Sequence, residues 1–386
     1  MKPQRFGFAL AALAFSSACF AAEVGYWSFD EGQGTVVADG SGTGNAGTLV
    51  NGANAWLPGV RGSALYFDGT LGPTCTRVEI LDNPSLRLSR SGSFAAWVYT
   101  EEAYRDAPVF AKEGPDGKLS YWFGQFFSGD GHWGTLLDQD GWQGWDFNGR
   151  QQGHIPVRRW THLAVTWDGA SVNYYRNGYL TNTLNWGGTI HSSDARLFIG
   201  SNAEYTFLGN RTSFHGAIDE VHLYDTAIPL GEVQALATAK LIGVSLLEGE
   251  EGTGDLGSLW SSDDLYYTAF NDPATLTSRV QFEGTTPYLA PSELKFALEY
   301  NVARGGLAYN IAFYRYASAS LVSMAGGVGS TVDESIAVTL GASAPEFVGA
   351  GGELLAVVRW NPINDEAPAY DGWLHRVDQA GWTYKN

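Results

Sequence analysis

The chain has 386 residues, with 41 acidic and 23 basic side chains and a formal net charge of −18 at pH 7. This charge repels phosphate backbones and anionic membranes, and no stripe of lysine and arginine offsets it, so nucleic acid is excluded as a partner. Aromatic residues make up 14%, with 14 Trp, and 49 residues are Gly. Such a composition is typical of an all-β module. Aromatic rings also suit carbohydrate binding, because they stack on the apolar faces of sugars.

The first 21 residues have the pattern of a secretory signal peptide. A positive start is followed by an apolar run over residues 6–15 and then by small residues. We expect cleavage after Ala21, which places the mature chain outside the cytoplasm. The alternative is cleavage before Cys19 with lipid anchoring, which Ser16 disfavours because such signals prefer a branched aliphatic residue there. No later run is long and apolar enough to span a bilayer.

The chain contains two cysteines, Cys19 and Cys75, and the first leaves with the signal peptide. No intrachain disulfide can then form, so the secreted chain must depend on the size of its core or on metal ions. The remaining length suffices for two domains with full cores.

From residue 24 to about residue 236, short alternating runs are separated by glycine turns, which predicts a sandwich or barrel. One helix is expected at residues 229–238, because Pro229 suits a first turn and apolar residues recur at helical spacing. The expected strands are 25–29, 64–67, 77–80, 93–99, 108–112, 121–125, 161–167, 171–176, 195–200 and 216–224.

The clearest local signal is the segment 160–178. Leu163, Val165 and Trp167 alternate with polar residues, which indicates a half-buried antiparallel strand. An Asp-Gly pair follows this strand and an Asn-Gly pair follows the next one. These dipeptides tolerate positive φ and therefore predict two tight hairpin turns. His162, on the polar face, is expected to have a structural role, with its ring bonded to neighbouring backbone.

This segment resembles the central hairpins of the laminin-G-like, concanavalin A-type jelly roll. Further motifs stand in the order that this group shows, at residues 26–35, 39–45, 62–69 and 216–227. The resemblance covers roughly residues 24–236 and implies a jelly-roll sandwich. Domains of this kind are mostly glycan-binding or adhesive modules, and some relatives on the same sandwich are glycoside hydrolases or polysaccharide lyases.

After Lys240 the composition of the sequence changes. Residues 248–254 are acidic and rich in glycine, which suggests a linker or a loop. The rest alternates again, and the expected strands are 293–300, 308–316, 335–340 and 353–360. We therefore predict an all-β chain with a concanavalin A-like jelly roll at 22–239 and a second β-sandwich at 240–386. The second part loosely resembles modules of secreted bacterial proteins and would serve as a scaffold or bind a surface or protein partner.

The resemblance also implies one structural Ca²⁺ near the meeting of the first loop and the last strand of the domain. Matching positions carry Asp39, Asn45 and Asp219. Ca²⁺ takes about six to eight oxygen ligands, which such loops supply. In the alternative interpretation Asp39 closes an Asx turn and Asp219 caps a strand end.

Aromatic rings gather among glycines and acids between residues 121 and 147. Trp133, Trp142 and Trp145 fall in expected loops, which lie at the surface, and hydrogen-bonding partners for sugar hydroxyls stand nearby. In the alternative interpretation these rings pack the core of the sandwich. The predicted ligand site comprises Trp133, Trp142, Trp145, Asp130, His132 and Asp140.

The sequence assigns no catalytic residue. Glycosidases need two carboxylates a defined distance apart, and neither a paired-carboxylate strand motif nor a full lyase signature is present. A lyase site using His132 or His154 with Tyr121 stays open. We therefore expect a secreted glycan-binding or adhesion protein with a Ca²⁺-stabilised jelly roll. The alternatives are a polysaccharide-active enzyme, lyase or glycoside hydrolase, on the same fold and a structural surface protein without a small ligand.

Overall fold

The computed structural model describes residues 22–52, 55–102, 105–114, 119–126, 132–138, 147–149, 152–202, 212–254, 259, 266–286, 288–363 and 373–385. The predicted signal peptide lies outside these residues. Regular structure among them is almost entirely β, which confirms the all-β prediction, and α1 at Leu230–Leu236 falls within the expected helix. In this part of the chain no helix has the length and apolar character needed to cross a membrane.

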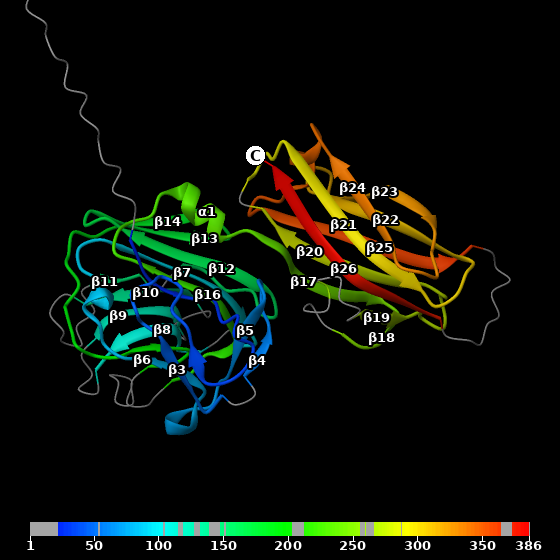
Figure 1. Ribbon diagram of the computed structural model, residues 1–386. Helices are drawn as coiled ribbons and strands as arrows, with labels where there is room; N and C mark the ends of the chain where they lie inside the picture. The colour runs from blue at the N-terminus through cyan, green and yellow to red at the C-terminus, as the bar shows by residue number, and fades with distance from the viewer. Residues whose placement is uncertain are drawn as a thin grey trace, which may run out of the picture.

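Strands β1 to β16 build two facing antiparallel sheets, here called the first sandwich (Figure 1). In the first sheet, in the order β14-β13-β12-β7-β16-β5-β4 with β1 beside β16, the bounds are Tyr179–Asn185, Ser171–Arg176, Trp160–Trp167, Gly92–Thr100, His215–Tyr224, Ser63–Asp68, Trp56–Pro58 and Glu23–Trp27. In the second, in the order β11-β10-β9-β8-β15-β6-β3-β2, they are Phe147–Asn148, Trp133–Leu137, Leu119–Gln125, Ala107–Glu113, Leu197–Ile199, Arg77–Ile80, Gly47–Val50 and Val36–Val37. Neighbours such as β7 and β16 lie far apart in sequence, as a jelly roll requires.

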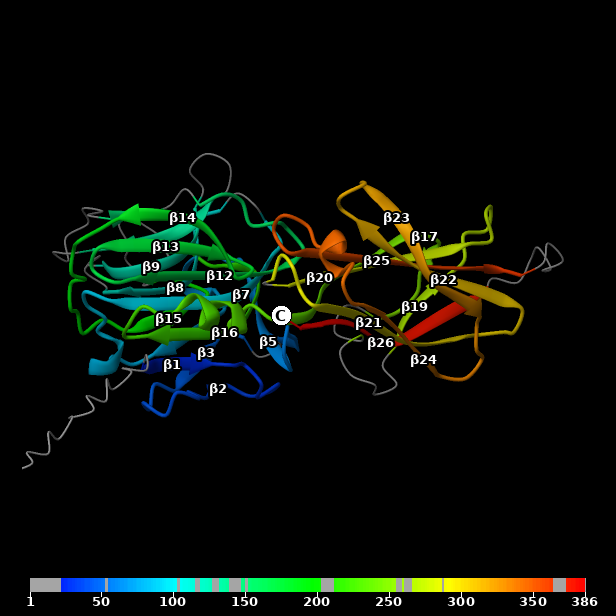
Figure 2. The same ribbon diagram turned by 90° about the horizontal axis from the view of Figure 1, so that it is seen from above.

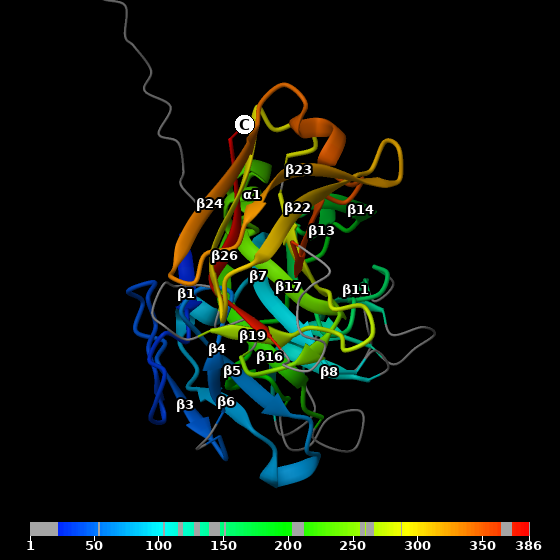
Figure 3. The ribbon, with the colours of Figure 1, turned by 90° about the vertical axis from the view of Figure 1, so that its right-hand side faces the viewer.

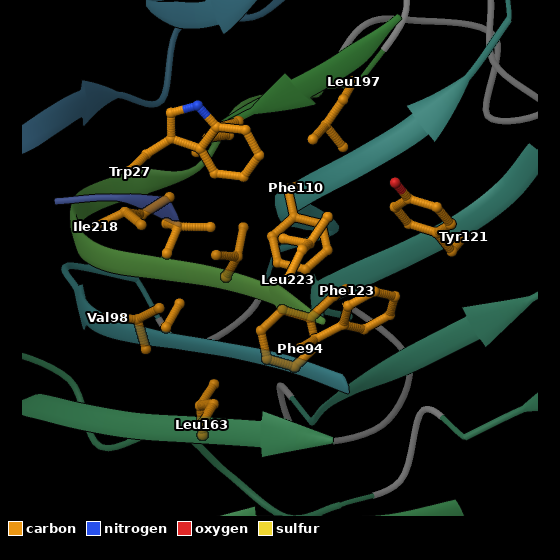
Figure 4. Packing of buried hydrophobic residues seen from close by; sticks show 14 of the residues in the cluster. Trp27, Phe94, Val98, Phe110, Tyr121, Phe123, Leu163, Leu197, Ile218 and Leu223 are labelled. Atoms are coloured by element: carbon orange, nitrogen blue, oxygen red, sulfur yellow. The ribbon is translucent and has the colours of Figure 1, made fainter. Parts of the chain in front are cut away.

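The core of the first sandwich lies between these two sheets. Phe94 from β7 packs against Phe110 from β8, with ring centroids 4.9 Å apart (Figure 4). It also packs against Trp167 from β12, with centroids 4.7 Å apart. Burying a large apolar side chain stabilises a fold by about 1.5–3 kcal/mol. Because many rings share this cluster, the first sandwich has a large core without a disulfide, and Cys75 is buried as a free thiol.

The predicted turns of the segment 160–178 form as expected. The Oδ1 of Asp168 accepts hydrogen bonds from the backbone N–H groups of Ala170 and Ser171, each at 2.9 Å. At the second turn Asn177 and Gly178 have φ of 52° and 81°, which is the left-handed backbone that a two-residue hairpin needs.

The prediction that β12 is half-buried is wrong, because all eight of its residues are buried. Its inward face joins the core as the alternation indicates. The outward face is covered by segments distant in sequence. Ala164 packs in a cluster with Val233 of α1, and Trp160 packs with Ile242 of β17.

Strands β17 to β26 build a second pair of sheets, here called the second sandwich, beside the first (Figures 1 and 2). Its first sheet, in the order β17-β20-β25-β22-β23, spans Ala239–Glu248, Ser278–Thr285, Glu353–Pro362, Leu307–Arg315 and Ser320–Val328. Its second, in the order β18-β19-β26-β21-β24, spans Glu250–Glu251, Tyr267–Phe270, Leu374–Lys385, Glu293–Val302 and Glu334–Leu340. Residues 248–254, interpreted from sequence as a linker or loop, therefore belong in part to strands inside the second sandwich.

The junction between the two sandwiches is built from specific contacts. Arg159 forms an ion pair with Glu283 of β20, and the hydroxyl of Tyr179 donates to the carbonyl of Thr286 at 2.7 Å. A Cβ on Gly352 would lie 2.5 Å from the Tyr179 ring, so glycine there lets the ring approach the backbone. Figure 3 views the molecule from the side of the second sandwich, with the first behind it.

Candidate functional site

The part of the predicted ligand site that the structure describes lies at one end of β10. His132 forms an isolated β-bridge with His154, and their rings stack with centroids 5.2 Å apart and planes at 21°. Arg176 donates from Nη1 to the His154 carbonyl at 3.2 Å, and Asn182 donates from Nδ2 to Oε1 of Gln152 at 3.0 Å. We call these five residues the histidine edge. Imidazole, amide and guanidinium groups together can donate and accept hydrogen bonds from hydroxyls.

Trp133 does not belong to a ligand-binding surface, which corrects the sequence prediction. It lies in β10 and is fully buried, with its ring 6.1 Å from that of Phe123 and 5.8 Å from that of Tyr174. The strand is short and contains Gly134, so its alternation was hidden and the segment was interpreted as a loop. The other predicted ligand residues, Trp142, Trp145, Asp130 and Asp140, lie outside the described residues.

The lyase arrangement left open by the sequence is not formed. Tyr121 lies in the core of the first sandwich, and its hydroxyl donates to the carbonyl of Leu86 at 2.9 Å. Burial raises the pKa of this phenol far above its usual value. It cannot serve as a proton donor or acceptor beside His132 or His154.

The first predicted calcium ligand, Asp39, organises its own loop. Its carboxylate accepts hydrogen bonds from the N–H groups of Tyr26, Ser41 and Asn45 and from the hydroxyls of Ser41 and Thr43. Burial alone would raise the pKa of Asp39, but these hydrogen bonds lower it below its usual value. The loop therefore holds its shape as an extended Asx turn, and a cation at this carboxylate would have to displace N–H donors.

Asn45 and Asp219 each keep one buried oxygen without a hydrogen-bond partner among the described residues. The Nδ2 of Asn45 donates to the carbonyl of Val24 at 2.6 Å, whereas Oδ1 has no partner among the described residues. Asp219 accepts from the N–H groups of Val60 and Arg61 through Oδ2, at 2.7 and 3.1 Å, and its Oδ1 is unpaired. Unpaired acceptors are what a cation would require. Within the described ranges, however, no group of three or more His, Cys, Asp or Glu could hold a metal ion.

A buried charged network surrounds Glu220, which the sequence treated only as part of a closing motif. Glu220 is 2% exposed and lies at a β-bulge of β16 with a φ of 51°. Its carboxylate binds Arg61 Nη1 at 2.7 Å and accepts from the Tyr26 hydroxyl at 2.9 Å. His222 stacks on Tyr26 with centroids 4.4 Å apart, and its Nδ1 lies 2.6 Å from Glu23 Oε1.

This network joins segments distant in sequence. Arg61 Nη2 also reaches the Thr238 hydroxyl at 3.1 Å and the carbonyls at the end of α1, where a cation complements the helix dipole. Glu220 and His222 are buried, and their side chains are already bound, Glu220 by Arg61 and Tyr26 and His222 by Glu23. We therefore interpret the network as structural. Arg61 and Glu220 lie far apart in the sequence, so the alternation of residues along β16 could not predict this network.

His162 is structural, but not in the way the sequence predicts. Its ring is fully buried, lies edge-on to Trp97 with centroids 5.3 Å apart, and has both nitrogens unpaired among the described residues. Burial lowers the pKa of His162 well below its usual value, so the ring is neutral and acts as a packing group. Its backbone N–H, not its ring, is bonded, to Oδ1 of Asn177 at 2.9 Å.

The sequence missed a cleft of about 260 Å³ at the junction of the two sandwiches. Tyr99 and Arg158 of the first sandwich line one side, and residues of β17, β18 and β19 with residues 252–254 line the other. The one available signal was the acidic, glycine-rich stretch 248–254, whose position opposite Arg158 only the fold reveals. The lining residues are Tyr99, Arg158, Gly243, Val244, Glu251, Gly252, Thr253, Gly254, Tyr267 and Thr268.

Comparison with known proteins finds a family similarity within the first sandwich. Residues 68–234 match the family model described as the concanavalin A-like lectin/glucanases superfamily. Over these residues the first sandwich is similar to that superfamily. The match lies within strands β5 to β16 and α1, and it confirms the resemblance drawn from the hairpin segment. A search of curated protein sequences finds no match.

Several solved structures resemble the chain. Domain 4 of AbnA, a GH43 extracellular arabinanase from Geobacillus stearothermophilus, in complex with arabinotriose, is 23% identical over 56% of this chain and 99% of that domain, with a TM-score of 0.44. Trypanosoma rangeli sialidase is 15% identical over 56% of this chain and 32% of that one, with a TM-score of 0.39. The binding domain of Paraclostridial Mosquitocidal Protein 1 is 11% identical over 68% and 64%, with a TM-score of 0.40. The chain thus spans about a third of the sialidase.

Proposed function

We propose that the chain is an extracytoplasmic carbohydrate-binding protein. The observation that carries the proposal is the family match over residues 68–234, to a superfamily described by lectins and glucanases. The histidine edge lies within these residues and offers polar groups that suit sugar hydroxyls. The location outside the cytoplasm rests on the predicted signal peptide.

The ligand site proposed here combines the histidine edge with Trp142 and Trp145, which would supply rings for stacking, and with Asp130 and Asp140 as hydrogen-bond acceptors. Trp133 belongs to the core of the first sandwich and is left out of this site. The second sandwich would hold the domain at a surface or against a protein partner.

The described groups favour binding over glycoside hydrolysis. Hydrolysis of a glycosidic bond uses two carboxyl groups on either side of that bond. The five residues of the histidine edge include no carboxylate, and Asp130 and Asp140 enter this proposal only as hydrogen-bond acceptors. The carboxylates of Asp219 and Glu220 are buried in backbone and ion-pair contacts, where a sugar cannot reach them.

A glycan array followed by calorimetry on the best ligand would test the proposal. We expect binding without release of reducing ends or unsaturated uronates. His154→Ala and the pair Trp142→Ala with Trp145→Ala should each weaken binding. His215→Ala is the matched control, because it removes a partly exposed imidazole that contacts Glu102 instead of the histidine edge.

Turnover of the bound glycan would contradict the binding function and support the alternative of a polysaccharide-active enzyme. Binding to no glycan on the array would support the structural alternative. Binding by His154→Ala and by the tryptophan double variant that equals binding by the His215→Ala control would place the ligand elsewhere on the molecule.

A structural calcium ion in the first sandwich is part of the same proposal. It is supported by the unpaired buried oxygens of Asn45 and Asp219, and the acidic chain favours cations in general. The hydrogen bonds already made by Asp39 argue against a site at that carboxylate alone.

A further inference from the structure

The cleft at the junction is formed by both sandwiches. Arg158 comes from the segment before β12, and Glu251, Thr253 and Thr268 come from the second sandwich. Its volume of about 260 Å³ lies just below the range of roughly 300–1,000 Å³ of pockets for drug-sized ligands. That volume suits one sugar ring better than an extended chain.

Arg158 is presented to the cleft by an unusual backbone conformation. Its φ is 54°, and its N–H donates to the carbonyl of Thr100 at 2.8 Å. A residue other than glycine costs about 1–2 kcal/mol in this left-handed region, so the surrounding contacts must hold it there. The side chain is 74% exposed, and Nε donates to Glu101 Oε2 at 3.1 Å. This contact uses one of the five N–H donors of a guanidinium.

The opposite wall is formed by two hydrogen-bonded segments, residues 252–254 and residues 267–268, which carry hydroxyl groups. Thr253 and Thr268 hold each other through both backbone and side chain, with their hydroxyls 3.0 Å apart. A Cβ on Gly252 would lie 2.2 Å from the Thr268 hydroxyl, and one on Gly254 would lie 2.3 Å from the Tyr266 carbonyl. Glycine at these two positions therefore lets the two segments of the wall pack closely.

The charges in the cleft select against a charged ligand. Arg158 is positive but already pairs with Glu101, and Glu251 is exposed on the opposite wall. A carboxylate ligand would meet Glu251, and a cation would meet Arg158. Hydroxyl groups can accept from the guanidinium and donate to the carboxylate at the same time. Tyr99 and Tyr267 add apolar ring surface.

We propose that this cleft is a second ligand site, separate from the histidine edge, which binds one uncharged sugar unit. Arg158 donates to ring hydroxyls, Glu251 accepts from them, and the paired Thr253 and Thr268 form the opposite wall. Binding also bridges the two sandwiches, because each contributes one of the two charged groups.

The test uses the full-length mature chain and saturation-transfer NMR with methyl glycosides of neutral hexoses and pentoses, and methyl glucuronide as the charged probe. Arg158→Asn removes the guanidinium, and asparagine tolerates the left-handed backbone. Arg196→Asn is the matched control, because Arg196 forms a single exposed ion pair with Glu79 away from the cleft. Melting curves check that each variant is folded.

We expect a neutral glycoside to bind the wild type. Arg158→Asn should bind it about tenfold or more weakly, because the variant loses one charge-assisted hydrogen bond to the sugar. Arg196→Asn and His154→Ala should leave this binding unchanged, which separates the cleft from the histidine edge. Glu251→Gln should raise the affinity for glucuronide relative to the neutral glycoside. The proposal is overturned if no neutral glycoside binds, if Arg158→Asn binds it as the wild type does, or if glucuronide binds the wild type more tightly.

Discussion

The Glu220 network gives a sharp stability prediction through Arg61→Met. The substitution keeps an apolar side chain but removes the charge paired with Glu220, which is 2% exposed. Removing one partner of a buried ion pair costs about 3–5 kcal/mol, because the other charge stays buried. Arg61 itself is 39% exposed and Tyr26 still donates to Glu220, so solvent screening reduces the loss. We expect about 2–3 kcal/mol.

Urea unfolding at pH 7, followed by near-ultraviolet circular dichroism, measures this loss as a lower midpoint at an unchanged m-value. The double variant Arg61→Met with Glu220→Gln should recover about 1–2 kcal/mol, because the buried charge is gone. Arg196→Met is the control, since an exposed pair is worth at most about 1 kcal/mol.

The pH dependence of the stability is a second test of the Arg61→Met prediction. Burial would raise the pKa of Glu220, but His222, Arg61 and Tyr26 together lower it. A lowered folded-state pKa stabilises the protein above the unfolded value of about 4.3 and ceases to do so as the pH falls through the folded value. In Arg61→Met, Glu220 can take up a proton, so the difference from the wild type should shrink below about pH 4.3. A loss under about 0.5 kcal/mol at pH 7, or a difference that stays constant with pH, would refute the reasoning.

Three further predictions concern the same domain. Burial lowers the pKa of His222, but Glu220 and Glu23 outweigh it and raise the value. Its stabilisation should therefore be complete below about pH 6.5 and vanish above the raised folded value, so urea midpoints of the wild type and His222→Gln should converge at alkaline pH; a constant gap would contradict this. Trp133→Phe should lower the free energy of unfolding by about 1–3 kcal/mol yet leave glycan affinity unchanged in calorimetry, and a selective loss of affinity would return Trp133 to the ligand site. Calcium added after EDTA treatment should give a binding heat and a higher melting temperature, both lost in Asn45→Ala; no heat and no shift would end the calcium proposal.

Local backbone chemistry was predictable from the sequence. The turns after β12 and β13 follow from Asp168 and from the positive φ of Asn177 and Gly178, which depend only on neighbouring residues. The inward face of β12 follows from alternation for the same reason. Its outward face was wrongly predicted as polar and exposed, because α1 and Ile242 that cover it come from much later in the chain.

Side-chain pairs between distant segments were not predictable. Glu220 looked like part of a family motif, and only the fold shows that Arg61 neutralises it. Trp133 looked like a loop residue because Gly134 interrupts a short strand. Arg158 and Glu251 line one cleft although they come from different sandwiches, and no periodicity within either segment predicts that.

The junction links the two proposed roles of the molecule. An ion pair from Arg159, a hydrogen bond from Tyr179 and the packing of Ile242 against Trp160 fix one sandwich against the other. A cleft between rigidly held walls loses little entropy when a ligand enters, and such preorganisation matters most for a ligand small enough to make few contacts. Loosening the junction should therefore weaken binding in the cleft while leaving the histidine edge intact, because that edge is built entirely from the first sandwich.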